Sequence, residues 1–271
     1  MPELPEVETV KNGLIKKVLN KKITNCKIIY EGIIAYPQKE KFIKNITNQT
    51  ITDIKRRGKF LIFELNNYYL ISHLRMEGKY FIKNKEESLN KHDHVIFILD
   101  DKEELRYNDT RKFGKMHLVK KDELNKTPLS KLGLEPWDKE LTKDYLKQKL
   151  NKKKAIKTLL LDQSIITGIG NIYADEILFL SKINPETQGC DLTNKNHQDI
   201  IDNTRVTLEK AIASGGTTIH SYTSVDGIHG RFQQELLVHN KKGKPCPTCQ
   251  TEILKIVVNG RGTYYCPKCQ K

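Results

Sequence analysis

Four of the six cysteines form two Cys-x-x-Cys pairs close to the end of the 271-residue sequence. The first pair is Cys246 and Cys249, the second is Cys266 and Cys269, and sixteen residues separate the two pairs. Two such pairs at this separation can place four thiolates tetrahedrally around one Zn²⁺. Four protein ligands leave no open coordination position, so the sequence predicts one structural zinc ion rather than a catalytic one.

Two other interpretations of these cysteines are less favourable. Disulfides need an oxidising compartment, and the acidic first segment, MPELPEVETV, lacks the apolar stretch of a secretory signal. Redox-active Cys-x-x-Cys pairs usually occur singly, near a βαβ pattern. Cys26 and Cys190 stand alone and are expected to be ordinary small apolar residues.

The charge is strongly positive, with 47 Lys and Arg residues against 33 Asp and Glu, which gives a formal net charge of +14. Only eight of the cations are Arg, so an AT-rich coding sequence would produce the same excess without a functional cause. Position is more informative, because residues 240–271 hold seven cations and one carboxylate, as is typical of a polyanion-binding surface. Charge alone leaves an acidic small molecule or an anionic membrane surface open as partners. No apolar run approaches the roughly 18 residues of a membrane span, so we expect a soluble intracellular protein.

The hydrophobic pattern of the first half predicts an amphipathic helix followed by a β-rich domain. Residues 6–19 have helical spacing, and residues 2–5 are expected to form an extended segment before them. From about 23 to 120 the pattern is strand-like, and short antiparallel strands joined by tight turns favour a sandwich or barrel that the helix covers. The predicted strands are Lys59–Leu65, Tyr68–Leu74, Lys79–Ile82, His94–Leu99, Glu104–Tyr107 and Lys115–Val119.

The second half is helical after a Pro- and Gly-containing linker. Helices are predicted at 143–150, 155–162, 171–182 and 197–214, with a glycine-bearing turn before the third and Asn171 as its N-cap. Amides at such a helix start attract phosphate, but the same segment also fits a purely structural helical hairpin. Residues 215–234 form a long polar loop, and 251–265 should be a hairpin ending in Asn259-Gly260-Arg261-Gly262.

The unusual chemical feature is Pro2, which becomes a free secondary amine if Met1 is removed. A terminal amine has a pKa near 7.7–8.0, so about a tenth or more is unprotonated and nucleophilic at neutral pH. Its attack on an electrophilic carbon gives an iminium, a strong electron sink, and the carboxyls of Glu3 and Glu6 lie close in sequence. A purely structural proline is the alternative that composition alone favours.

Seven motifs in one order decide between these alternatives. They are MPELPEVETV, RRGKF at 56–60, SHLRMEGKY at 72–80, KHDH at 91–94, NDTRKFG at 108–114, GIGNIYADE at 168–176 and the CxxC…GRGT…CxxC tail. Together they resemble the formamidopyrimidine-DNA glycosylase family over essentially the whole chain. The resemblance implies a monomeric enzyme that excises oxidised purines, chiefly 8-oxoguanine and formamidopyrimidines, from duplex DNA and then cuts the strand as an AP lyase, with no small-molecule cofactor.

The implied fold is α+β and multi-domain. An N-terminal antiparallel β-sandwich with its flanking helix would span 2–128, and a linker would span 129–138. A helix-two-turn-helix domain would span 139–236 and include a lesion loop at 217–230. A four-Cys zinc-finger hairpin would span 237–271. Such a repair enzyme is expected in the bacterial cytosol, at the nucleoid.

The resemblance also assigns the chemistry. Pro2 would attack C1′ of the damaged nucleoside, and Glu3 would act as the acid during base loss and opening of the sugar. Lys59 would donate a proton for β-elimination, Arg261 would do so for δ-elimination, and Glu6 would position the N-terminus. Donors beside an anionic backbone need cationic or buried surroundings to hold the right proton at neutral pH.

The implied DNA contacts follow from base flipping, which glycosylases use to reach their target. Met76 and Phe113 would fill the gap in the stack, and Arg111 would contact the opposite cytosine. His92, Lys152, Asn171 and Arg261 would contact phosphates. His92 in its His-x-His pair is also compatible with a metal site, although two ligands do not make one.

Two positions depart from the family pattern, and two other functions stay open. His239-Asn240 stands where the family has a tyrosine-glycine pair, and His220 replaces a longer cation. An endonuclease VIII type enzyme, which acts on oxidised pyrimidines, would share the nucleophile, but that group typically begins Pro-Glu-Gly-Pro-Glu rather than with this chain's Pro-Glu-Leu-Pro-Glu. A zinc-finger DNA-binding protein without catalysis would be indicated by a retained Met1.

Overall fold

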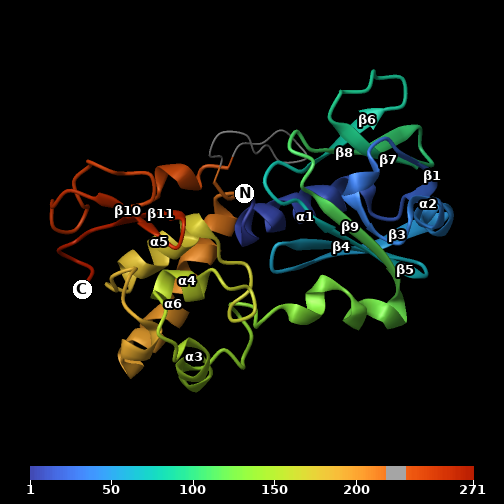
Figure 1. Ribbon diagram of the computed structural model, residues 1–271. Helices are drawn as coiled ribbons and strands as arrows, with labels where there is room; N and C mark the ends of the chain where they lie inside the picture. The colour runs from blue at the N-terminus through green and yellow to red at the C-terminus, as the bar shows by residue number, and fades with distance from the viewer. Residues whose placement is uncertain (218–229) are drawn as a thin grey trace. The chain divides into compact units, whose positions relative to one another are not determined.

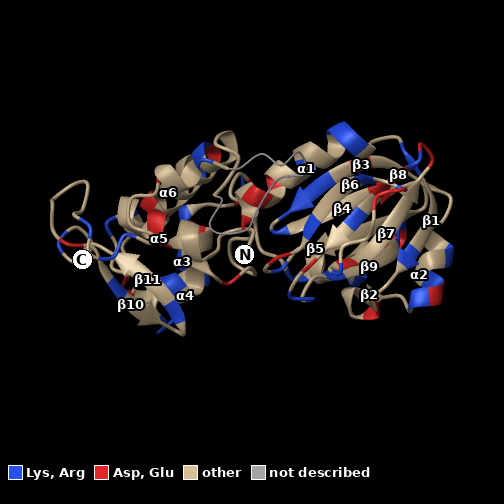
Figure 2. Cartoon of the chain, turned by 90° about the horizontal axis from the view of Figure 1, so that it is seen from above, with Lys and Arg blue, Asp and Glu red and all other residues tan. Residues whose placement is uncertain are grey.

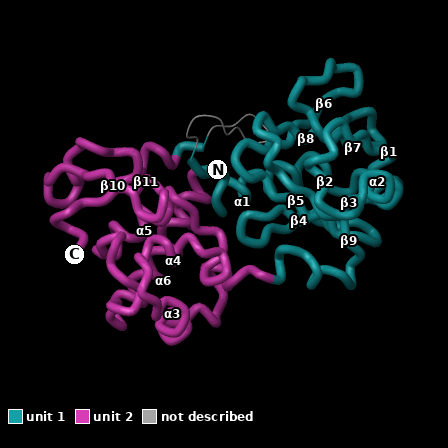
Figure 3. The backbone as a smooth tube through the Cα atoms, in the orientation of Figure 1, with its two compact units in different colours: residues 1–130, 215–231 teal, residues 131–214, 232–271 magenta. Residues whose placement is uncertain are grey.

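The computed structural model describes residues 1–217 and 230–271 and divides into two compact units (Figure 3). Unit 1 contains residues 1–130 and 215–231, and unit 2 contains residues 131–214 and 232–271. The chain therefore leaves unit 1, builds most of unit 2, returns to unit 1 and finishes in unit 2. The predicted α+β class is confirmed. No helix in the described ranges is long and apolar enough to cross a membrane.

Unit 1 is built on a sheet whose strand order is β2-β9-β5-β4-β3-β1-β7-β8-β6. All neighbouring strands in it are antiparallel except β2 and β9. β1 pairs with β3 only at Lys22 and Ile23, and with β7 as far as Ile28, so the sheet passes from one layer to the other at β1. Figure 1 shows β4, β5 and β9 in one layer and β6, β7 and β8 in the other, which confirms the predicted sandwich. The strands are β1 (Lys22–Ile28), β2 (Ile34–Tyr36), β3 (Gln49–Arg57), β4 (Phe60–Leu65), β5 (Tyr68–His73), β6 (Lys79–Asn84), β7 (Asp93–Leu99), β8 (Glu103–Asn108) and β9 (Lys115–Lys120).

The helix α1 (Leu4–Val18) packs on β3 and β4 and buries its apolar face in the core of unit 1. Its buried residues include Val7, Val10 and Leu14, which recur at the helical spacing that predicted it. Residues 2–5 were expected to be extended, and this is wrong for Leu4 and Pro5. Proline has no N–H to lose in a first helical turn, so the helix begins before it.

A second helix, α2 (Lys39–Ile46), interrupts the region that was predicted to be strands. Its buried Phe42 and Ile46 are four residues apart and lie on one helical face, which packs on β1. The helix is too short for its periodicity to stand out from the surrounding strand pattern.

Unit 2 contains the helices α3 (Lys143–Leu150), α4 (Ile156–Leu160), α5 (Asn171–Leu180) and α6 (Asn194–Ala213). All four helices were predicted. The helix α6 begins three residues before its predicted start because Thr193 and Asn196 form a reciprocal capping box. Asn171 was predicted as an N-cap, and this is wrong, since Gly170 holds the extended N-cap conformation. Short 3₁₀ segments lie at Glu31–Ile33, Lys121–Lys126, Pro128–Lys131, Gly189–Asp191 and Phe232–Gln234.

The predicted C-terminal hairpin is present as β10 (Leu254–Val258) and β11 (Arg261–Tyr265). Asn259 and Gly260 form its two-residue turn with φ of 46° and 73°, the combination for which Asn-Gly is favoured. The turn therefore lies in the middle of the hairpin and not at its end. Arg261 is the first residue of the returning strand.

Candidate active site and nucleic-acid interface

The N-terminal segment of unit 1 is buried and held by a carboxylate. Pro2, Glu3 and Glu6 are all buried, and Glu3 is the N-cap of α1. The Glu6 carboxylate accepts the backbone N–H of Glu3 at 2.8 Å, which fixes the peptide that directly follows Pro2. The carboxylates of Glu3 at the N-cap and Glu6 in the first turn are also favoured by the positive end of the helix dipole.

The same carboxylate holds a second segment of unit 1 from far along the chain. Glu6 Oε1 accepts the backbone N–H of Thr217 at 2.7 Å and its hydroxyl at 3.1 Å. Gly216 has φ of +78°, and a Cβ there would lie 2.7 Å from Glu6 Oε1, so only glycine allows this approach. The sequence motifs predict a positioning role for Glu6 but do not identify Thr217, because nothing local links residues that are 211 positions apart.

Lys59 lies in the tight turn between β3 and β4. Gly58 precedes it with φ of 55°, as the first central position of a two-residue hairpin turn can require. Lys59 is only 5% exposed, an unusual burial for a lysine, so its ammonium group is held in place rather than moving in solvent.

His73, at the end of β5, stays neutral near Lys59. Burial, together with the positive charges of Arg75 and Lys59, lowers the pKa of His73 to about 3. Its Nδ1 accepts the backbone N–H of Arg75 at 2.9 Å, and its ring packs edge-on against Phe60. At neutral pH, the uncharged ring of His73 therefore adds no positive charge near Lys59.

This buried histidine predicts a pH-dependent stability. Between pH 6.5 and 3, the folded state binds fewer protons than the unfolded state. The contribution of His73 to the free energy of unfolding is therefore fully present above pH 6.5 and is lost as the pH falls toward 3. From pH 7 to pH 5, the free energy of unfolding should fall by about 2 kcal/mol more in the wild type than in His73→Asn. Urea unfolding followed by circular dichroism measures this difference, and equal losses in both proteins would contradict the assignment.

The residues predicted to fill the DNA stack lie in two loops of unit 1. Met76 is half-buried in the turn between β5 and β6, and Arg111 and Phe113 lie between β8 and β9. Phe113 is 50% exposed, and an exposed apolar side chain of this size can mark a surface that binds a partner. The Arg111 guanidinium carbon lies 4.8 Å from the centroid of the Phe113 ring, so the two side chains stack on each other.

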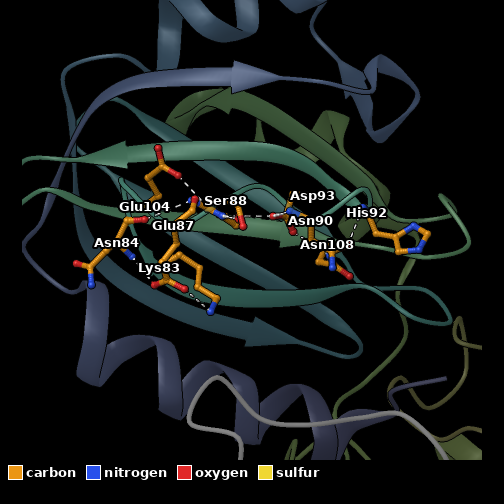
Figure 4. A network of polar contacts seen from close by, with 10 residues as sticks. Lys83, Asn84, Glu87, Ser88, Asn90, His92, Asp93, Glu104 and Asn108 are labelled. Atoms are coloured by element: carbon orange, nitrogen blue, oxygen red, sulfur yellow. Dashed lines mark hydrogen bonds and ion pairs between the residues drawn. The ribbon is translucent and has the colours of Figure 1, made fainter.

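His92 ends the loop between β6 and β7, which a polar network holds (Figure 4). The side chain of Asn90 accepts the His92 N–H, and the Asp93 carboxylate accepts from the Asn90 N–H and the Asn108 amide, all at 2.8–2.9 Å. Arg106 is buried and donates to the carbonyl of Asn84, the last residue of β6, and to the carbonyls of Glu87 and Ser88 in the loop. Figure 4 shows the His92 ring pointing away from the other side chains of the network. Among the described residues, His92 and His94 are not part of a metal-binding cluster.

In unit 2, a second network holds the strand on which Arg261 lies. Lys157 and Asp175 are fully buried and form an ion pair of 2.6 Å. The Gly262 carbonyl accepts from Lys157 Nζ at 3.2 Å and from the Asn171 side-chain amide at 3.0 Å. The exposed Arg261 side chain therefore projects from a backbone that is fixed directly beside it. Lys157 and Asp175 were not predicted, since in the sequence both resemble ordinary charged residues on the surfaces of helices.

His239, where the sequence departs from the family pattern, belongs to the same network. Its Nδ1 lies 2.6 Å from the Asp175 carboxylate, whose other oxygen takes the ion pair with Lys157. The neighbouring Glu176 carboxylate accepts the backbone N–H groups of Leu237, Val238 and His239. Burial raises the pKa of Glu176, and those three donors oppose that shift.

The four cysteines of unit 2 form a metal-binding cluster, the only one of three or more His, Cys, Asp or Glu ligands in the described chain. Their ligand atoms all lie within 4.8 Å of one another, with 3.8 Å between Cys246 and Cys269 and 3.4 Å between Cys249 and Cys266. A tetrahedral zinc with bonds of about 2.3 Å requires sulfur separations of about 3.8 Å, so this donor set fits one structural Zn²⁺. Lys and Arg residues lie on both strands of the hairpin (Figure 2).

Lys152 is exposed in the turn that follows α3, with its side chain open to a ligand. His220 and most of the predicted lesion loop, residues 218–229, lie outside the described residues. The predicted residues of unit 1 are Pro2, Glu3, Glu6, Lys59, Met76, His92, Arg111 and Phe113, and those of unit 2 are Lys152, Asn171, Arg261 and the four cysteines.

A hairpin with four cysteines that fit zinc, together with exposed cations on its strands, defines a class, the zinc-finger proteins that bind nucleic acid. Family models agree over most of the chain. The formamidopyrimidine-DNA glycosylase N-terminal domain matches residues 1–116, and the H2TH domain of the same enzymes matches 132–223. The zinc finger found in FPG and IleRS matches 243–271.

Curated relatives extend the match to the full length. The formamidopyrimidine-DNA glycosylase of Bacillus subtilis is 48% identical over 273 residues, covering 100% of this chain and 99% of the relative. That of Ligilactobacillus salivarius is 50% identical with the same coverage. This chain belongs to the formamidopyrimidine-DNA glycosylase family, the base-excision repair glycosylases with AP lyase activity.

Solved structures give the same result. A Lactococcus lactis FPG point mutant in complex with Fapy-dG containing DNA has a TM-score of 0.94 and 41% identity, covering 100% of both chains. The Lactococcus lactis Fpg bound to DNA with an abasic site has a TM-score of 0.93 and 40% identity, covering 99% of both chains.

Proposed function

We propose that this protein removes oxidised purines, 8-oxoguanine and formamidopyrimidines, from duplex DNA and then cuts the strand by β,δ-elimination. The observation that carries the proposal is the full-length similarity to an enzyme solved with Fapy-dG DNA. The buried N-terminus of unit 1 supports the same chemistry, because Glu6 fixes the peptide beside Pro2. The protein is expected to carry out this repair in the bacterial cytosol, at the nucleoid.

The reaction begins once Met1 is removed, since the nitrogen of Pro2 is an amide until then. The unprotonated amine attacks C1′ and gives up its N–H proton, the bond from C1′ to the base breaks, and the base leaves with the bonding electrons and takes up a proton. Glu3, beside the nucleophile, gives the proton that opens the sugar ring. The product is an iminium between Pro2 and C1′, which withdraws electrons and acidifies the C2′ protons.

Strand cleavage follows from that acidity. Loss of a C2′ proton expels the 3′ phosphate in β-elimination, and a second elimination expels the 5′ phosphate. Lys59 donates a proton in the first step and Arg261 in the second. The burial of Lys59 and the fixed backbone at Gly262 support these roles, because both cations are attached to rigid elements.

DNA binding uses both units. Met76 and Phe113 fill the space that the flipped nucleotide leaves, and Arg111 contacts the opposite cytosine. His92, Lys152, Asn171 and Arg261 hold phosphates. Two observations support these roles. Phe113 is exposed and free to insert between bases, and the Arg111 guanidinium stacks on its ring, which places it to contact the opposite base.

The deciding experiment is borohydride trapping on a duplex with 8-oxoguanine opposite cytosine, followed by mass mapping of the cross-link. An adduct on Pro2 supports both the nucleophile and the substrate class. An adduct formed only with an oxidised pyrimidine would favour the endonuclease VIII type. That comparison is needed because the Lactococcus lactis enzyme has also been solved with DNA that contains an oxidised pyrimidine. No adduct with either lesion, from protein that lacks Met1, would overturn the enzymatic proposal.

Phosphate binding predicts a steep salt dependence of affinity. Each neutralised phosphate contributes about −0.9 to the slope of log K against log salt concentration, so Lys152→Ala should make the slope shallower by about 1. Fluorescence anisotropy with a duplex carrying an abasic analogue measures the slope. Lys44→Ala, a lysine on α2 away from the predicted contacts, serves as the control and should keep the wild-type slope. Equal slopes in all three proteins would exclude Lys152 from the phosphate contacts.

A further inference from the structure

Two loops of unit 1 meet at one buried hydroxyl, that of Tyr107 on β8. Tyr107 is fully buried, and its Oη lies against the backbone of Gly78 and Gly114. A Cβ would lie 2.2 Å from that oxygen at Gly78 and 1.7 Å from it at Gly114, so both positions require glycine. Gly78 ends the turn that carries Met76, and Gly114 ends the loop that carries Arg111 and Phe113.

A buried carboxylate beside this hydroxyl fixes the second loop at both ends. Asp109 is fully buried, and its Oδ1 accepts the Arg111 N–H at 3.0 Å. Its Oδ2 accepts the Gly114 N–H at 2.8 Å and the Tyr107 hydroxyl at 3.4 Å. A buried carboxylate is costly unless it is hydrogen-bonded, so these donors and the loop conformation depend on each other.

The backbone of Asp109 connects this loop to the segment that carries His92. The Asp109 N–H donates to the His92 carbonyl at 3.0 Å, and the Asp109 carbonyl lies 2.8 Å from Nε2 of His94. Within the first loop, the Gly78 N–H donates to the Leu74 carbonyl at 3.0 Å and closes the turn around Met76. Tyr107 and Asp109 thus contact the three described segments of unit 1 that carry Met76, His92 and the pair Arg111 and Phe113.

We propose that the Tyr107 hydroxyl and the Asp109 carboxylate are positioning groups that set Met76, Arg111 and Phe113 relative to one another. They thereby determine how strictly the enzyme requires cytosine opposite the lesion. The inference rests on the proposed function, since Arg111 must read the opposite base. The hydroxyl spaces the two loops, while the carboxylate orients the peptide from which Arg111 projects.

The test compares Tyr107→Phe and Asp109→Asn with wild type on 8-oxoguanine opposite cytosine and opposite adenine. The readout is the ratio of the two kcat/KM values, which a uniform loss of folded enzyme does not change. We expect that ratio to fall roughly three- to tenfold in Tyr107→Phe. A larger fall is expected in Asp109→Asn, because an amide offers one acceptor oxygen for two N–H donors.

Tyr80→Phe is the matched control. Tyr80 is also buried and packs against the Tyr107 ring, but its hydroxyl donates to Ser72 at 2.8 Å. Its ratio should equal the wild-type ratio, and thermal unfolding reports the stability of each protein. If Asp109→Asn does not fold, the ratio of the two kcat/KM values measured for Tyr107→Phe is sufficient to test the proposal. A folded variant of either residue with the wild-type ratio would overturn the proposal, whereas wild-type protein without excision would instead contradict the proposed function.

Discussion

Pro2→Gly should reduce cleavage of DNA containing 8-oxoguanine by about a thousandfold or more while leaving lesion binding within a few-fold of wild type. Glycine keeps a terminal amine but makes it primary, so the adduct with C1′ becomes an imine that must gain a proton before it withdraws electrons. Loss of the pyrrolidine ring also frees the residue before the N-cap of α1, which is buried in the wild type. Binding should persist because the cations and the stacking residues are unchanged.

Single-turnover cleavage and anisotropy with an uncleavable abasic analogue measure the two effects separately. Pro128→Gly is the control, since Pro128 begins a 3₁₀ segment outside the candidate site and its replacement should leave both values near wild type. Cleavage by Pro2→Gly within tenfold of wild type would exclude the ring nitrogen as the required nucleophile.

Removal of zinc should lower the affinity for lesion DNA at least about a hundredfold. A two-stranded hairpin is marginal on its own, and structural zinc supplies about 10–16 kcal/mol of apparent binding free energy in small zinc domains. Without the ion, four thiols held within 4.8 Å of one another lose the bonds that keep the two knuckles together. Arg261, on β11, would then lose its fixed position.

Chelation followed by anisotropy and circular dichroism tests this, with recovery on addition of Zn²⁺ as the check for reversibility. Cys249→Ser should reproduce the loss, whereas Cys190→Ser, which changes an exposed cysteine outside the cluster, should not. Tight binding of lesion DNA by the chelated protein would show that the hairpin is dispensable for recognition.

The fold was predictable where the signal is local. Two Cys-x-x-Cys pairs identify the zinc ligands, and short segments rich in β-branched and aromatic residues, separated by turns, identify most strands of unit 1. The helix α2 was missed because two turns are too few for a clear period. The N-cap assignment of Asn171 failed because an asparagine beside a glycine fits two adjacent positions, and only backbone angles distinguish them.

The site was less predictable than the fold because its supports are distant in sequence or buried. The motifs name Glu6, but its partner Thr217 belongs to a later segment with no pattern of its own. Lys157 and Asp175 pair only after α4 and α5 pack, so no spacing rule predicts that ion pair. In the sequence, Tyr107 resembles an ordinary strand residue and Asp109 an ordinary loop residue. Their shared role depends on contacts with Gly78 and Gly114, which lie in different loops, so no local pattern predicts it.

The bond between Glu6 and Thr217 also has a consequence for biosynthesis. Glu6 leaves the ribosome 211 residues before its partner, which corresponds to about 10–40 s at roughly 5–20 residues per second. The unit that is translated first is therefore completed late, after the first part of the helical unit has been made. Nascent chains that stop before residue 217 cannot hold the start of α1 as the finished protein does, so the peptide that follows Pro2 gains its full support only near the end of translation.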